Sequence, residues 1–174
     1  DEPISPNHSN PMKPRYSYLV LAFLVTANVQ AASITLTATD AAGATSFNTA
    51  GKWSNALAPA AGNTYSVAVQ WLRTPPNGTS ATFAGDSLSI NTGGGMLYKG
   101  TGTTATLTIS NLILNGGLIR SGSGAADTMR IAGGLSVTGT GSIINADQGP
   151  FIFDSVVTGT GALTTSSAGT GFPV

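Results

Sequence analysis

Short alternations of apolar and polar residues run through the chain from residue 32 onward. Ile34 and Leu36 alternate with serine and threonine, which is the period-2 pattern of a strand with one buried face. A second run places four large side chains on one expected face: Tyr65, Val67, Val69 and Trp71. These two runs predict an opening pair of strands, each anchored by apolar residues.

No part of this stretch has the apolar spacing of a helix. Apolar residues never recur through i, i+3, i+4 and i+7, because Gly, Thr and Ser interrupt every candidate. The clearest break is "RTPPNG" at residues 73–78, where two prolines cannot donate to a ladder and Asn-Gly favours a turn. We therefore expect an all-β chain, with an N-terminal β cap region at residues 32–82 and a second region at residues 83–174.

The second region divides into four segments of similar shape, beginning at residues 83, 104, 127 and 150. Each opens with an alternating apolar pair, and in the last three a second apolar segment, a glycine-containing corner and a third short segment follow. In the first segment the corner at 93–95 follows the opening pair directly. The opening pairs are Leu88/Ile90, Leu107/Ile109, Met129/Ile131 and Phe151/Phe153.

Three short strands in roughly 22 residues, joined by Gly and Asn corners, are typical of one coil of a right-handed parallel β-helix. Glycine at the corners supplies the positive φ that such turns need. Stacked coils would place Leu, Ile and Val inside and Thr, Ser and Asn outside. We predict a solenoid of about four coils. An antiparallel sandwich or meander is the alternative, and the short strands and fixed segment order disfavour it.

Composition narrows the classes of partner. Charged residues make up 8% of the chain, against roughly 25% in an average soluble protein, and the net charge is zero. A neutral chain has no electrostatic attraction to nucleic acid or anionic lipid, so neither is expected as a partner. The chain has no Cys, which excludes disulfides and thiolate metal sites. Its single His, His8, lies ahead of the expected mature protein, and no cofactor or metal is predicted.

An export signal is predicted at residues 12–31. Two positive charges after Met12 precede an apolar run of about a dozen residues that ends in Val-Gln-Ala, and these small residues predict cleavage between Ala31 and Ala32. The alternative is a membrane anchor, but the run is shorter than the roughly 20 residues that span a bilayer. The mature segment is therefore expected to be exported without membrane insertion.

Both ends of the sequence carry further expectations. Residues 1–11 are polar and interrupted by proline, and we interpret them as a non-native upstream extension. The Gly-Thr pattern still runs in the last residues of the chain, so the repeats at 83–174 are expected to continue beyond it.

Four stretches carry a family resemblance: "FNTAGKWSNALAPAAGNTYSV", "LRTPPNGTSATFAGDSLSI", "GGGMLYKG" and "LTISNLILNGGLIRSG". They resemble the N-terminal regions of exported bacterial surface proteins of the PEP-CTERM type with autotransporter-associated β-strand repeats, abundant in Verrucomicrobia. The resemblance implies a long β-helical passenger at the cell surface, associated with the outer membrane, or in the extracellular space. It implies an adhesive or matrix-like role and supplies no catalytic residues.

Candidate chemistry is sparse. Asp127, Asp147 and Asp154, with Arg120 and Arg130 nearby, are the groups on which a β-helical polysaccharide-degrading enzyme would depend. Single Asp residues at turns, bonded to their own backbone or paired with Arg, explain Asp86, Asp127 and Asp147 without catalysis, and no catalytic residue is predicted.

Aromatic residues offer a different possibility. Trp53, Trp71 and Tyr98 are candidates for stacking on sugar rings, although aromatics at such positions are more often core anchors. The sequence therefore favours a non-enzymatic, adhesin-like β-helical passenger segment, with extracellular glycans or matrix as candidate partners. A carbohydrate-binding module and the N-terminal part of a β-helical polysaccharide-degrading enzyme remain the alternatives.

Overall fold

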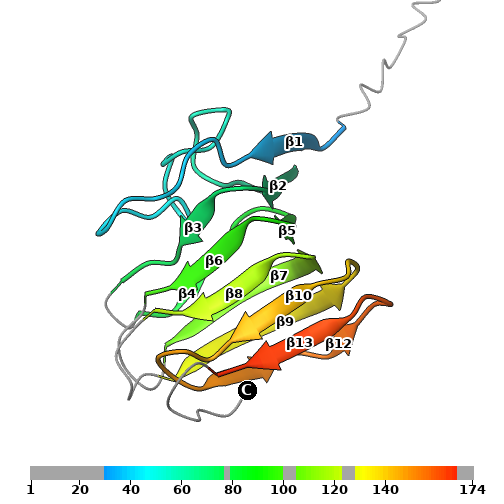
Figure 1. Ribbon diagram of the computed structural model, residues 1–174. Coiled ribbons are helices and arrows are strands. Elements are labelled where there is room, and N and C mark those ends of the chain that lie inside the picture. The colour runs from blue at the N-terminus through cyan, green and yellow to red at the C-terminus, as the bar shows by residue number, and fades with distance from the viewer. Residues whose placement is uncertain (1–29, 77–78, 100–104, 123–127, 168–174) are drawn as a thin grey trace, which may run out of the picture.

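The computed structural model describes residues 30–76, 79–99, 105–122 and 128–167, and this part of the chain is built from strands and turns without a helix (Figure 1). The all-β prediction is therefore confirmed. The strands are β1 Ala32–Thr35, β2 Asn63–Val67, β3 Trp71–Arg73, β4 Ala81–Thr82, β5 Ser87–Asn91, β6 Gly95–Tyr98, β7 Thr106–Asn115, β8 Leu118–Ser121, β9 Met129–Val137, β10 Ser142–Asn145, β11 Phe151–Asp154, β12 Val157–Thr158 and β13 Leu163–Ser166.

The strands form two parallel sheets that together make a β-solenoid of about four coils. One sheet runs β1-β2-β5-β7-β9-β11, with β4 and β12 paired at its side, and the other runs β3-β6-β8-β10-β13. Figure 1 shows the coils stacked from β1 at one end to β12 and β13 at the other. Every pairing between the described strands is parallel, which confirms the β-helix and excludes the antiparallel sandwich or meander.

Equivalent side chains stack along the solenoid with a step of 22 to 24 residues. One such ladder consists of Tyr65, Leu88, Leu112, Leu135 and Val157. The first four are at most 2% exposed and belong to one continuous apolar core. Each buried side chain of this kind stabilises the fold by roughly 1.5 to 3 kcal/mol relative to exposure. The repeat therefore stacks equivalent apolar side chains of successive coils on one another in the core.

The alignment of the first repeat segment needs correction. Leu88 was expected to match Leu107, but it pairs with Leu112, in the second apolar segment of the following coil. In the preceding coil the partner of Leu107 is Ala81, seven residues before Leu88. A period-2 run specifies which side chains are buried but not which wall of the coil they belong to, so the sequence alone misassigned this wall.

The parallel pairing also continues across the boundary expected at residue 82. Strand β2 pairs with β5, β3 with β6 and β4 with β7, and β1 pairs with β2, so all four strands described in the region 32–82 lie in the same two sheets as the later coils. What distinguishes the N-terminal region is the long segment 37–62 between β1 and β2, described below.

Two of the three predicted segments per coil are joined in the middle of the solenoid. Strands β7 and β9 each run through both, with a bulge between Ile109 and Asn111. Opposite it, Gly133 has a φ of 108°, and a Cβ there would lie 2.7 Å from the carbonyl carbon of Ile109. Glycine therefore permits both the backbone conformation and the close approach at this bend.

The expectation that Tyr65, Val67, Val69 and Trp71 share one face is wrong after Val67. A corner between β2 and β3 reverses the alternation: Val69 is 71% exposed, Leu72 is buried and Trp71 points outward. The corner continues into β3 without a Gly or Pro to mark it in the sequence, and this is why the pattern appears unbroken there.

The segment 37–62 covers the N-terminal end of the solenoid. Its part around Trp53 runs antiparallel to β1, with Thr37 N donating to Lys52 O and Ser54 N donating to Thr35 O, each at 2.9 Å. Four rings pack edge to face beneath it: Phe47, Trp53, Tyr65 and Phe83. The segment therefore covers the backbone edge at the end of β1 and the apolar interior of the first coil.

A buried carboxylate fixes this cap to the sheet. Asp40 is 4% exposed and accepts hydrogen bonds from Ser46 N at 2.8 Å, Ser46 Oγ at 2.6 Å and Arg73 N at 3.0 Å. The Ser46 carbonyl in turn accepts from Trp53 Nε1 at 2.6 Å. Asp40 thus links the cap to β3, and the buried charge is stabilised by three donors.

Candidate functional site

The outer face of the five-stranded sheet carries a partly exposed tryptophan, Trp71, and two partly exposed arginines, Arg73 and Arg120. Inward positions of this sheet are buried, as at Leu72, Met96 and Ile119. The strand register aligns the intervening outward positions in one row, which consists of Trp71, Gly95, Leu118, Ile143 and Thr164. The row therefore presents an indole ring and two aliphatic side chains on a sheet surface.

Trp71 is placed by the residue that follows it in this row. A Cβ on Gly95 would lie 2.6 Å from both Cε3 and Cζ3 of the indole, so the ring covers the space above Gly95. Only glycine leaves room for the ring in this position. Trp71 remains partly exposed, and its indole lies close to the sheet instead of projecting from it.

The next outward row adds positive charge. It contains Arg73, Leu97, Arg120 and Asn145, all partly exposed. Arg73 follows Trp71 by two positions on β3, so both side chains emerge on the same face. An aromatic ring beside a guanidinium, flanked by aliphatic side chains, is a combination that carbohydrate and other ring-containing ligands use for stacking and hydrogen bonding.

The three aromatic residues proposed from the sequence do not form one surface. Trp53 is 3% exposed and belongs to the cap, and Tyr98 is 1% exposed within the coil interior. Neither ring offers a face to a ligand, so the prediction that they contact glycans is corrected: both are core anchors. Trp71 alone of the three retains an outward position. Residues two positions apart on a strand point to the same side, so the sequence could have indicated that Arg73 shares a face with Trp71. That inference requires knowing that a corner precedes β3.

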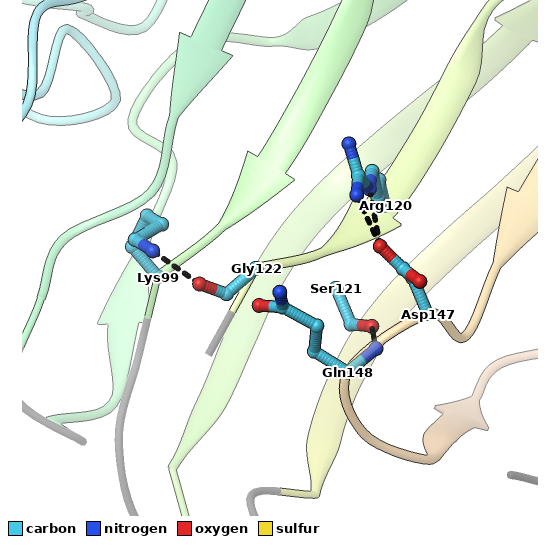
Figure 2. A network of polar contacts seen from close by, with 6 residues as sticks. All are labelled: Lys99, Arg120, Ser121, Gly122, Asp147 and Gln148. Atoms are coloured by element: carbon cyan, nitrogen blue, oxygen red, sulfur yellow. Dashed lines mark hydrogen bonds and ion pairs between the residues drawn. The ribbon is translucent and has the colours of Figure 1, made fainter. Parts of the chain in front are cut away.

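A network of polar contacts lies where the strands of the same sheet end (Figure 2). Arg120 forms an ion pair with Asp147, Lys99 Nζ donates to Gly122 O, and Gln148 N donates to Ser121 Oγ. Each link joins residues 23 to 27 positions apart, that is, one coil to the next. The network therefore holds successive coils together at this corner.

The carboxylates considered for catalysis are also engaged in contacts within the protein. Asp147 pairs with Arg120, and Asp154 pairs with Arg130 at 2.5 Å. Asp86 accepts from Gly62 N at 2.9 Å. Asp127 lies outside the described residues. Within the described ranges, no group of three or more His, Cys, Asp or Glu side chains is arranged to hold a metal ion.

The predicted cleavage point lies at the start of the fold. Ala32 is the first residue of β1, and Ala31 and Ala32 are both exposed. Residues 1–11 and most of the predicted signal lie outside the described residues. In the part of the chain that the structure describes, no helix of the length and apolar character needed to cross a membrane is found.

Comparisons with protein-family models, with curated proteins and with solved structures return no match.

Proposed function

We propose that this chain is a non-enzymatic, exported β-helical passenger segment that serves as a structural, adhesin-like scaffold of a bacterial cell-surface or extracellular protein. The observation that carries the proposal is the use of the charged side chains. Arg120–Asp147 and Arg130–Asp154 each connect one coil to the next, and Asp40 fastens the cap. These charged side chains contact neighbouring parts of the protein and stabilise the stack of coils. Such use of charge supports a structural role.

The construction of the coils supports the same role. A solenoid grows by adding equivalent coils, and its stability is approximately a sum of coil and neighbour terms. Such a rod displays the residues on its outer faces around one continuous apolar core. The low charge and the Thr- and Ser-rich outer positions suit a surface meant to lie in the extracellular medium.

Export is tested by expressing the 174-residue chain in a Gram-negative host and analysing the exported protein by intact-mass and N-terminal sequencing. We expect a product that begins at Ala32. As a control, Ala31→Arg removes the small residue required at the cleavage point and should leave the protein unprocessed. An unprocessed cytoplasmic product from the wild-type chain would contradict the proposal.

A second candidate function, carbohydrate binding, is favoured by one observation: Trp71 lies beside Arg73 on an outer sheet face. A glycan array probed with the wild-type protein and with Trp71→Ala tests it. Leu57→Ala, at a residue that is 64% exposed on the cap, is the matched control. Binding that Trp71→Ala abolishes and Leu57→Ala preserves supports this function. No binding by any of the three proteins removes it.

A further inference from the structure

The indole of Trp71 lies flat on the outer face of the five-stranded sheet. Three consecutive atoms of its six-membered ring, Cδ2, Cε3 and Cζ3, lie 2.6 to 2.9 Å from the position that a Cβ on Gly95 would take. Such nearly equal distances place that position over the face of the ring and not beside its edge. One face of the indole therefore rests on Gly95, and the opposite face of this partly exposed side chain points away from the sheet.

The backbone that carries this ring is fixed by the cap. Trp71 N donates to Thr39 Oγ1 at 3.2 Å, and Trp71 O accepts from Asp40 N at 3.0 Å. Arg73 N donates to Asp40 Oδ2 at 3.0 Å, and Arg73 O accepts from Thr45 Oγ1 at 2.7 Å. Strand β3 is thus held between β6 on one side and the cap on the other, so the positions of Trp71 and Arg73 are set before a ligand arrives.

The guanidinium of Arg73 forms no hydrogen bond or ion pair with another residue that the structure describes. The other two arginines in the described ranges each pair with a carboxylate, Arg120 with Asp147 and Arg130 with Asp154. The two outward rows of the five-stranded sheet contain no acidic residue. Arg73 therefore places an uncompensated positive charge beside the outward face of the indole.

We propose that this face binds an acidic sugar of the uronate type, with the sugar ring stacked on Trp71 and its carboxylate paired with Arg73. The proposal rests on the carbohydrate binding put forward above and names the class of sugar. The two side chains start about 6.6 Å apart along β3 and leave it on the same side. A uronate carries its carboxylate at the edge of the ring, so a ring lying on the indole directs this group across the sheet toward the guanidinium. The guanidinium can donate two parallel hydrogen bonds to it.

The charge of the protein favours a sugar over nucleic acid at this face. Nucleic-acid binding depends on neutralising several phosphates at once, and the chain has a net charge of zero. On this face Arg120 is already paired with Asp147, and Lys99 Nζ donates to Gly122 O, which leaves Arg73 for a ligand. One arginine beside one ring matches a sugar unit that carries one carboxylate.

Isothermal titration calorimetry of the full chain with a short oligogalacturonate and with its fully methyl-esterified form tests the proposal, because esterification removes the charge and keeps the sugar rings. We expect the acid to bind about tenfold more tightly than the ester. Arg73→Gln should weaken binding of the acid by about tenfold and leave binding of the ester unchanged. Trp71→Ala should weaken binding of both, because it removes the surface on which the ring stacks.

Arg130→Gln is the matched control. Arg130 is a partly exposed arginine on the outer face of the other sheet, and its substitution changes the net charge by the same amount as Arg73→Gln. It should leave binding of both oligomers unchanged, and circular dichroism should show that all three variants are folded. Equal weakening by Arg73→Gln and Arg130→Gln overturns the proposal, since the effect would then follow the net charge and not the site.

Two further results separate the acidic sugar from carbohydrate binding itself. Equal binding of acid and ester, both lost in Trp71→Ala, overturns the acidic sugar and leaves carbohydrate binding standing. Failure of both oligomers and of every glycan on the array overturns both. A short dextran sulfate and a single-stranded oligonucleotide complete the series: tighter binding of either one than of oligogalacturonate overturns the assignment to a carboxylate-bearing sugar.

Discussion

The indole of Trp71 covers Gly95, the residue directly paired with it in the neighbouring coil, so that the two residues share one space on the outer face of the sheet. This relationship gives Gly95→Ala a definite consequence. The added Cβ would lie 2.6 Å from the indole, and the ring must move or the strand must shift. We expect a loss of about 1 to 3 kcal/mol in the free energy of unfolding, measured by urea denaturation.

The Trp71→Ala background provides the control for that prediction. Once the indole is removed, the three atoms nearest to the Cβ added by Gly95→Ala are gone, and the two losses should not add. Additive losses would show that Gly95 is required for another reason than its contact with Trp71.

Asp40 is predicted to be the most important polar residue of the cap. Asp40→Ala leaves the donors Ser46 N, Ser46 Oγ and Arg73 N without their buried acceptor. Unsatisfied buried groups cost about 1 to 3 kcal/mol each, and partial access of water should hold the total to about 3 kcal/mol. Asp86→Ala, which removes one exposed contact to Gly62 N, should cost less than about 1 kcal/mol. Equal melting temperatures for the two variants would contradict this role.

The corner at Gly116 combines two constraints that a matched pair of variants separates. Gly116 has a φ of 80°, and a Cβ there would lie 2.9 Å from Thr140 O. Gly141 has a similar φ of 75° but no atom within 4 Å of such a Cβ. Gly116→Val should therefore disrupt folding, whereas Gly141→Val should cost only the backbone strain, about 1 to 3 kcal/mol. If Gly116→Val were as stable as the wild type, the register of the β-helix would be wrong.

The ion pair between Arg120 and Asp147 is predicted to contribute modestly. The Arg120 side chain is 44% exposed and Asp147 is 15% exposed, so solvent screens much of the attraction. A double-mutant cycle with Arg120→Gln and Asp147→Asn should give a coupling of no more than about 1 kcal/mol at low salt, and less at 1 M salt. A coupling that does not change with salt would show that the contact is not mainly electrostatic.

The fold could be predicted from the sequence because its signal is repeated in every coil. Glycine corners such as Gly116, and alternating pairs such as Leu112 and Leu114, recur at nearly constant spacing and need no long-range information. The assignment of Leu88 to one wall of the coil could not be predicted. Alternation shows which side chains point inward, but it does not show which strand of the next coil lies beside them. The corner before Trp71 was missed since it carries neither Gly nor Pro.

The candidate site was harder to predict for a related reason. Trp53, Trp71 and Tyr98 have the same side-chain character in the sequence, and only tertiary packing separates the two buried rings from the outward one. Asp40 gave no sequence signal, because its donors come from a turn and from a strand 33 residues away. The coil-to-coil contact of Arg120 likewise depends on the register that brings Asp147, 27 residues away, beside it.

Disulfide formation measures the coil register most directly, since the chain contains no native cysteine. Ser89 of β5 is paired with Ile113 of β7, and Asn115 lies two residues further along β7 on the same face. Mild oxidation of Ser89→Cys/Ile113→Cys should produce an intramolecular disulfide, visible as a mass loss of about two hydrogens, because paired positions on adjacent strands lie within disulfide reach. Ser89→Cys/Asn115→Cys, offset to roughly 7 to 8 Å, should react far more slowly. Equal rates for both pairs, or faster reaction of the offset pair, would contradict the stacking of coils in this register.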